Sequence, residues 1–161
     1  MDREAEGNDP RDALLYLASV RSLDQQQAVV ESVRSRAGIL LSAASVATSF
    51  LAGIALSKGK LHGWDWAATI CFLGVVALCL AILWPTRQWT FRFNAKKVVR
   101  DYIEADPPAT LSEMHRDLAL HMEDWAEGNS WKMRWLFAYF QAASVLLGVE
   151  VLLWIVDLWG K

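Results

Sequence analysis

The sequence predicts an all-α integral membrane protein with three transmembrane helices and further cytoplasmic or interfacial helices. Three observations support this fold class. Three apolar stretches are each long enough to cross a bilayer, positive residues gather on one side of those stretches, and tryptophans gather near their ends. Hydrophobic residues make up 54% of the 161-residue chain, above the usual share for a soluble protein. This length suits one modest domain.

The N-terminal segment, residues 1–36, is expected to be a cytoplasmic helix. Asp9 is a candidate N-cap, and Pro10 suits the first helical position. The helix can run to Arg36 and continue into the first apolar stretch. Its apolar positions are sparse, so its middle should be solvated or packed against another polar helix. These positions are Leu14, Leu17, Ala18, Ala28, Val29 and Val33.

The three apolar stretches cover residues 37–57, 66–84 and 135–156. At a rise of about 1.5 Å per residue they are each roughly 28–33 Å long, which matches a hydrocarbon core of about 30 Å. The first two, which contain no charged residue, form a predicted transmembrane hairpin over 37–85. The third forms the last transmembrane helix within the C-terminal segment, 133–161.

Most tryptophans lie where apolar and polar sequence meet, which is typical of aromatic belts at the two membrane–water interfaces. The tryptophans expected in these belts are Trp64, Trp66, Trp84, Trp89, Trp131, Trp135, Trp154 and Trp159.

The positive residues predict the orientation, because cytoplasmic segments of membrane proteins carry an excess of lysine and arginine. Of the 16 lysines and arginines, only Lys58, Lys60 and Lys161 lie on the side of the 58–65 loop and the C-terminus. The other positive residues precede the first span or lie between the second and third. The N-terminus and the 86–134 segment should therefore be cytoplasmic, and the C-terminus should lie outside.

The cytoplasmic segment 86–132 begins with aromatic residues interleaved with cations. One interpretation is an interfacial anchor, with rings at the headgroups and cations on anionic lipid. The other is a binding site for a phosphate-bearing ligand, and one surface can serve both purposes. Together with two arginines before the first span, the candidate ligand-binding residues are Arg87, Arg92, Lys96, Lys97, Arg100, Arg34 and Arg36.

The rest of this segment predicts further helices. The sequence "DPP" at 106–108 breaks a helix, and "TLSE" at 110–113 is a capping box in which Thr110 and Glu113 satisfy each other's backbone N–H groups. Gly128 is placed to end the helix that follows, and Asn129 or Ser130 to begin the next.

An apolar stripe on the helix after the capping box needs a partner, which is either the first cytoplasmic helix or the membrane surface. Its residues recur at three- and four-residue spacing: Leu111, Met114, His115, Leu118, Met122 and Trp125. His115 and His121 are six residues apart and do not share a helix face, so we interpret them as surface or interface residues and expect no metal site.

No catalytic chemistry is visible in the sequence, and an enzyme is not expected. The chain has no phosphate-cradling glycine loop, no metal-spaced cluster and no nucleophile–base pair, so we assign no catalytic residue and expect no cofactor. The net charge of −2 does not indicate a DNA or RNA partner. Cys71 and Cys79 lie inside an apolar run and are interpreted as small core residues.

Small and polar residues inside the spans predict close helix packing. Gly38, Ser42, Ser45, Ser49 and Ala52 form one stripe in the first span, and Gln141, Ser144 and Gly148 form another in the third. Glu150 lies about half a turn from Gln141, at about 100° per residue. Polar groups on two opposite faces of the third span suggest that copies of the chain pack together as a homo-oligomer.

Glu150 is the one acid within the 135–156 span, and it admits two interpretations. A carboxylate in hydrocarbon is costly, so the group should be neutral or partnered. As a neutral hydrogen-bonded acid it would hold helices together, with Thr48, Ser49, Thr69 and Cys71 as candidate partners. As part of a ring of carboxylates, with Gln141 as a further polar candidate, it would line a path for ions or protons between subunits.

The stretch "RSRAGILLSAASVATSFLAGIAL", residues 34–56, resembles the first-span motif of small bacterial membrane proteins encoded beside nucleotide-signalling defence genes. The resemblance is to the transmembrane effectors of the Pycsar anti-phage system and, more distantly, to two-span SLATT effectors. Arg34 and the triplet "RAG" at 36–38 occupy the places of the charged residue and the basic-Ala-small triplet in that motif. The order of a helical hairpin, cytoplasmic helices and a last span is also similar.

This resemblance implies a function in antiviral defence at the bacterial inner membrane. A partner cyclase would make a cyclic pyrimidine nucleotide, cUMP or cCMP, and the membrane protein would respond by impairing membrane integrity, which causes abortive infection. No cyclic-nucleotide-binding β-roll is recognisable, so the ligand site would be helical or lie between subunits. One alternative is a non-catalytic scaffold or accessory subunit that docks a cytoplasmic partner through the Leu111–Trp125 stripe. A small proton-coupled transporter is disfavoured because three spans without an inverted repeat leave little room for a substrate site.

Overall fold

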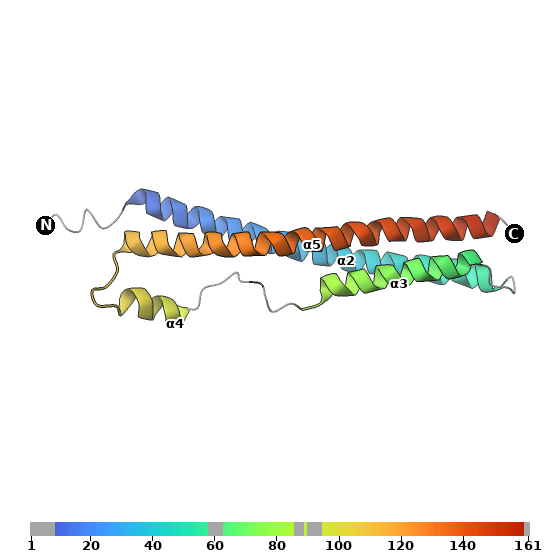
Figure 1. Ribbon diagram of the computed structural model, residues 1–161, viewed down its shortest axis with the longest axis horizontal. Helices are drawn as coiled ribbons and strands as arrows, with labels where there is room; N and C mark the ends of the chain where they lie inside the picture. The colour runs from blue at the N-terminus through green and yellow to red at the C-terminus, as the bar shows by residue number, and fades with distance from the viewer. Residues whose placement is uncertain (1–8, 58–62, 86–88, 90–94, 160–161) are drawn as a thin grey trace. The chain divides into compact units, whose positions relative to one another are not determined.

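The computed structural model describes residues 9–57, 63–85, 89 and 95–159. Over these ranges all regular structure is helical, which confirms the predicted all-α fold class (Figure 1). The elements are α2 (Pro10–Ser57), α3 (Gly63–Leu83), α4 (Ala95–Val98), the π-helical turn η1 (Val99–Ile103) and α5 (Leu111–Trp159).

Three of these helices, α2, α3 and α5, are long and apolar enough to cross a membrane, as predicted. α3 has 21 residues, a length of about 32 Å, and is apolar over nearly its whole length. α2 and α5 have 48 and 49 residues, more than twice what a bilayer requires. Each of these two helices therefore combines a span with a polar part.

The chain forms two compact units. The polar unit consists of Met1–Val29 and Arg87–Lys132, and the apolar unit consists of Val30–Thr86 and Met133–Lys161. Helices α2 and α5 supply residues to both units without a break in the helix.

The start of α2 has the predicted cap. The backbone N–H of Arg11 donates to Oδ1 of Asp9 at 2.9 Å, and the backbone N–H of Asp12 donates to the Asp9 carbonyl at 3.1 Å. These bonds satisfy two donors that the first turn of a helix leaves free. From this cap α2 continues through the first span to Ser57, as the sequence predicts.

The capping box at the start of α5 is confirmed. The backbone N–H and the hydroxyl of Thr110 both donate to Oε2 of Glu113 at 2.8 Å, and the Glu113 N–H donates back to Oγ1 of Thr110 at 3.3 Å. The "DPP" sequence lies between η1 and α5, outside any helix, as expected.

The prediction that Gly128 ends a helix is wrong, because α5 runs through this position to Trp159. Asn129 is buried, and the Ser130 hydroxyl donates to the carbonyl of Glu127 at 2.7 Å, so neither residue caps a new helix. The physical reason is packing. A glycine in a helix interior costs only about 1 kcal/mol, and the burial of Ala126 and Asn129 on either side offsets it.

The core of the polar unit joins α2 to α5. Met122 and Ala126 of α5 pack against Leu23 of α2, and partly buried residues surround them. The Tyr16 ring stacks on His115, with centroids 5.1 Å apart. The Leu111–Trp125 stripe therefore packs on the first helix, which was one of its two predicted partners, although Leu111 itself is exposed.

Not all apolar side chains of α2 in the polar unit lie on its buried face. Tyr16, Val20 and Leu23 pack toward α5, whereas Leu14 and Leu17 are 66% and 60% exposed. An apolar strip of α2 is thus left open in this unit.

The core of the apolar unit contains side chains from all three long helices. Ala44, Val75, Cys79 and Ala143 form a buried cluster there, which confirms the interpretation of Cys79 as a small core residue. Cys71 is half-buried, and both cysteines are free thiols. A Cβ at Gly74 would lie 3.1 Å from Cδ1 of Leu146, so α3 and α5 approach closely at this level.

Trp154 does not have the exposed ring expected of a tryptophan in an interfacial belt. Trp154 is buried against Ala68, whose small side chain leaves room for the indole between α3 and α5. Six of the other tryptophans expected in the belts have exposed side chains: Trp64, Trp66, Trp84, Trp131, Trp135 and Trp159.

Buried residues recur every seven positions along the two long helices. On α2 they are Leu23, Val30, Ala37 and Ala44, and on α5 they are Met122, Asn129, Leu136, Ala143, Glu150 and Asp157. A seven-residue spacing of buried positions is typical of helices that pack side by side along their length.

We expect Gly128→Ala to stabilise α5 by about 0.5–1 kcal/mol, because alanine fits the helix better and a Cβ at this position meets no atom within 4 Å. The measurement is the midpoint of thermal unfolding in mild detergent, monitored by circular dichroism. The control is Gly74→Ala, where the tight contact with Leu146 should cancel the gain. A midpoint unchanged or lowered by Gly128→Ala would contradict a continuous helix here.

The capping box also predicts a pH dependence. Hydrogen bonds from the backbone and side chain of Thr110 hold the pKa of Glu113 below its usual value. A carboxyl whose pKa is lower in the folded state stabilises it above the unfolded-state pKa, and the stabilisation disappears as the pH falls through the folded-state pKa. The wild type should therefore exceed Glu113→Gln in thermal midpoint at neutral pH, and the difference should vanish in acid.

The control for this experiment is Glu123→Gln, which removes an exposed acid of α5 that makes no hydrogen bond within the described residues. It should leave the midpoint unchanged at neutral pH. If Glu113→Gln behaves in the same way, the capping box does not stabilise α5.

Candidate functional site

A buried carboxyl group lies inside the apolar unit. Glu150 of α5 is 0% exposed, and the Thr48 hydroxyl of α2 donates a hydrogen bond to its Oε1. Its Oε2 is also buried and has no hydrogen-bond partner within the described residues. The carboxyl group thus joins two spans through one oxygen, and the second oxygen is left available.

Trp154 lies one helical turn beyond Glu150 on the same face of α5. Its indole N–H approaches the carboxyl group without making a well-formed hydrogen bond. Because Trp154 also packs on Ala68 of α3, the surroundings of Glu150 include side chains from all three spans.

Only one of the four candidate partners bonds Glu150 in the described part of the chain. The hydroxyls of Ser49 and Thr69 donate instead to backbone carbonyls of their own helices, at 2.7 and 2.8 Å. Thr48 follows Ala44 by one turn on the face of α2 that points into the core, whereas Ser49 is exposed. The helix register therefore selects Thr48.

The environment of Glu150 favours its uncharged form. No described cation pairs with it, and an unpaired carboxylate in an apolar interior costs several kcal/mol. A neutral acid that bonds across two helices matches the interpretation of Glu150 as a packing group. A ring of carboxylates between subunits would require an exposed Glu150, and within one chain this side chain faces the interior.

Gln141 does not take part in this arrangement. It lies on the exposed face of α5, about half a turn from Glu150, as the helical periodicity predicts. The two polar residues proposed for the third span are therefore not brought together within the chain.

Two further acids, which no sequence motif singles out, are also buried in the apolar unit. Asp65 lies in the first turn of α3, where the helix dipole favours a negative charge, and Asp157 lies near the end of α5. Asp157 follows Glu150 by seven residues, so the seven-residue spacing was a signal that could have identified it. The exposed fractions of Asp65 and Asp157 are only 1% and 4%.

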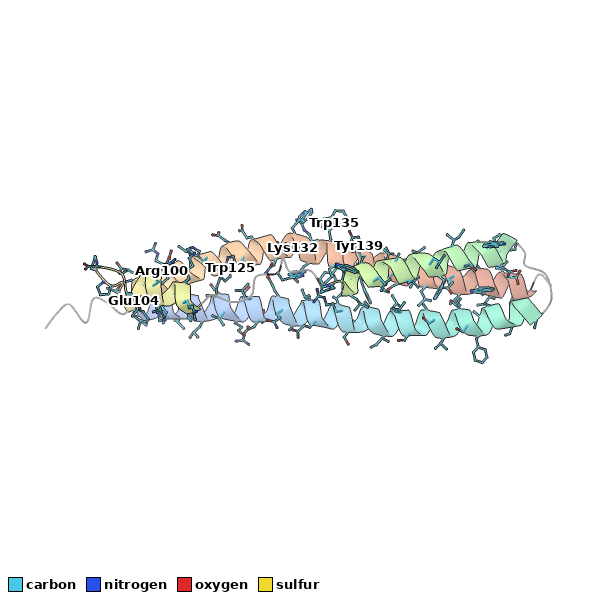
Figure 2. The ribbon with its side chains drawn as sticks, turned by 90° about the horizontal axis from the view of Figure 1, so that it is seen from below. Arg100, Glu104, Trp125, Lys132, Trp135 and Tyr139 are labelled. Atoms are coloured by element: carbon cyan, nitrogen blue, oxygen red, sulfur yellow. The ribbon has the colours of Figure 1, made fainter. Side chains whose placement is uncertain are left out.

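The candidate cationic surface is partly described. Lys96 and Lys97 are exposed on α4. The Arg100 side chain in η1 is 72% exposed and pairs with Asp101 at 2.9 Å; Figure 2 shows the position of Arg100. Arg34 and Arg36 belong to the apolar unit, where Arg34 is half-buried and Arg36 is exposed. The remaining two predicted residues, Arg87 and Arg92, lie outside the described residues.

A hydrogen bond fastens the cationic turn to α5. The Tyr102 hydroxyl of η1 donates to Oδ2 of Asp117, and the backbone N–H of Ala109 donates to the Tyr102 carbonyl at 3.0 Å. Burial, followed by the hydrogen bond and the charge of Asp117, raises the pKa of Tyr102 to about 12. Lys96, Lys97 and Arg100 are thereby held near the beginning of α5.

Aromatic and cationic side chains also meet farther along α5. Lys132 lies 5.8 Å from the centre of the Trp89 ring, a distance that permits a cation–π contact. Trp135 and Tyr139 lie one turn apart, with ring centroids separated by 6.0 Å (Figure 2). This part of α5 has the mixed aromatic and basic composition of a membrane–water interface.

Among the described residues, no group of three or more His, Cys, Asp or Glu side chains is placed to hold a metal ion. Comparisons with protein families, with curated proteins and with solved structures find no match to this chain.

We expect Thr48→Val to destabilise the apolar unit by about 1 kcal/mol, because both oxygens of Glu150 would then lack a partner. The measurement is the thermal midpoint in detergent. Glu150→Gln should cost less, since its amide oxygen can still accept from Thr48. Thr69→Val is the matched control, because that hydroxyl bonds only its own helix. Equal losses from the two threonine substitutions would contradict the interhelical bond.

Proposed function

We propose that this chain is a membrane effector of a bacterial anti-phage defence system. In this proposal the polar unit binds a cyclic pyrimidine nucleotide, cUMP or cCMP, made by a partner cyclase. The apolar unit then impairs the membrane, and the infected cell dies by abortive infection. The protein would be a multi-pass protein of the inner membrane, with its N-terminus in the cytoplasm and its C-terminus outside, and would act without catalysis.

The observation that carries the proposal is the sharing of two long helices between a polar unit and an apolar unit. α2 and α5 each continue from one unit into the other as a single hydrogen-bonded helix. A helix transmits a displacement along its axis better than a flexible linker does. This organisation suits a protein that detects a signal in water and responds within lipid.

The cations at the beginning of α5 support a phosphate-bearing ligand. Lys96, Lys97 and Arg100 lie within five residues of one another, and the Tyr102–Asp117 bond holds their segment against α5. The phosphodiester of a cyclic nucleotide carries one negative charge, which exposed cations attract. Binding at this segment would act directly on the packing of α5 in the polar unit.

The buried acids of the apolar unit support membrane impairment as the output. Glu150, Asp65 and Asp157 are buried while the three spans stay packed. Only Glu150 lies within a predicted span, because Asp65 and Asp157 lie one residue beyond the 66–84 and 135–156 stretches. If the spans separate, the Glu150 carboxyl group loses its protein surroundings and requires water or a charged partner inside the bilayer. Separation of the three helices would therefore expose a polar group that is already present inside the bundle, and water could then enter the membrane around it.

A different observation favours the scaffold alternative, namely that Leu14 and Leu17 of α2 form an exposed apolar surface outside the spans. The Leu111–Trp125 stripe itself packs against α2 within the polar unit and is therefore not free to dock a partner. A scaffold would use the surface of Leu14 and Leu17 and would show no response to a nucleotide.

The test is dye release from liposomes that contain the purified full-length chain. We expect cUMP or cCMP, but not cAMP, to increase the release rate. The triple substitution Lys96→Gln, Lys97→Gln and Arg100→Gln should raise the nucleotide concentration required by about tenfold or more, because charge-assisted hydrogen bonds to the phosphate would be lost.

A matched control removes three exposed cations from other parts of the polar unit, Arg11→Gln, Arg21→Gln and Arg116→Gln. It should respond like the wild type. Dye release unaffected by either pyrimidine nucleotide would rule out the effector proposal and leave the scaffold alternative. An equal loss of response in both triple variants would show that overall charge, rather than this segment, attracts the ligand.

A further inference from the structure

The exposed face of α5 in the apolar unit carries an amide that has no partner among the described residues. Gln141 is exposed, and its side chain makes no hydrogen bond within the described residues. It lies six residues past Trp135, roughly 9 Å along the helix, and therefore inside the predicted span. An amide that faces hydrocarbon without a hydrogen-bond partner is unfavourable, so we expect a polar group from outside the described residues to bond Gln141.

Four serine hydroxyl groups on exposed faces of the spans make no such demand. Each donates to the backbone carbonyl one turn earlier in its own helix and is satisfied there. These bonds are Ser42 to Gly38, Ser45 to Leu41, Ser49 to Ser45 and Ser144 to Phe140. The small-residue stripe of the first span therefore requires no second helix, whereas Gln141 does.

The surface around Gln141 is shaped for close approach of another helix. Ser144 and Gly148 follow it at spacings of three and four residues, and both are exposed. A Cβ placed at Gly148 would meet no atom within 4 Å, so no described residue fills the space above it. Small residues on one face allow helix backbones in a bilayer to come close enough for polar side chains to bond.

We propose that a second copy of this chain covers the face, and that the Gln141 amides of the two copies bond each other. All copies insert in the same orientation, so two of them are related by an axis along the membrane normal. Identical residues then meet at the same depth. An amide has both donors and an acceptor, which makes Gln141 complementary to itself.

Glu150 cannot take this place, because it points into the interior of its own chain and bonds Thr48. The interface therefore depends on Gln141 and its two small neighbours. It does not depend on the nucleotide proposed above, and the test below uses no nucleotide.

The test is disulfide cross-linking of the full-length chain in liposomes. Ser144→Cys places a thiol on the proposed interface and leaves the Gln141 amide intact. Oxidation should convert this variant to a covalent dimer. Ala142→Cys is the matched control, since it is also exposed and lies at a similar depth but points about 160° away around the helix. The wild type measures any background from Cys71 and Cys79.

Adding Gln141→Leu to the Ser144→Cys variant should lower the rate of cross-linking about three- to tenfold, because the helices can still meet but the amide bond is lost. Gln141→Asn, which keeps an amide, should restore part of the rate. Circular dichroism of each variant verifies that the helices are intact. Equal cross-linking at residues 142 and 144, no covalent dimer, or a rate unaffected by Gln141→Leu would each overturn the proposal.

Oxidation of Ser144→Cys in whole membranes distinguishes a second copy from other occupants. A product of twice the mass of the chain supports the proposal. A product with a different membrane protein, in place of the dimer, overturns it, as does a face that remains unlinked and contacts lipid only.

Discussion

The packing of this chain depends on a single spacing, the seven-residue interval between buried positions on α2 and α5. A straight α-helix has about 3.6 residues per turn, so a face that recurs every seven residues turns only slowly around the helix. A helix with that pattern can keep one side toward a neighbour over many turns. Both units use the same arrangement, although one is rich in polar residues and the other is almost entirely apolar.

The seven-residue positions of α5 also determine where polar side chains can be buried. Asn129, Glu150 and Asp157 occupy positions in the same series as Leu136 and Ala143. A polar group at such a position favours the one alignment in which its partner is within reach, and it penalises alignments that leave it unpaired. The bond between Thr48 and Glu150 therefore contributes to the alignment of α2 and α5 more than to their overall affinity.

The sequence predicts the features of this fold that arise from local chemistry. The Asp9 cap, the capping box at Thr110 and the length of the three spans each depend on a few neighbouring residues, and all three are confirmed. Gly128 shows the limit of such signals. A glycine followed by Asn and Ser resembles a helix end, and only burial of the surrounding side chains keeps α5 intact there.

The sequence does not determine which way an individual side chain faces. Trp154 stands near the end of an apolar stretch, where an exposed ring is the usual outcome, yet its side chain packs on Ala68 and is buried. The composition of the third span marks Glu150 as unusual, but the choice among its four candidate partners depends on the relative rotation of two helices. That rotation arises from packing between distant segments, which no single stretch of sequence encodes.

Helix α3 differs from the other two long helices in that all of its described residues belong to the apolar unit. The Gly74–Leu146 approach and the Ala68–Trp154 contact both join it to α5. α3 therefore adds a third helix to the apolar unit without extending into the polar one, and its small residues at these two levels set how closely it packs on α5.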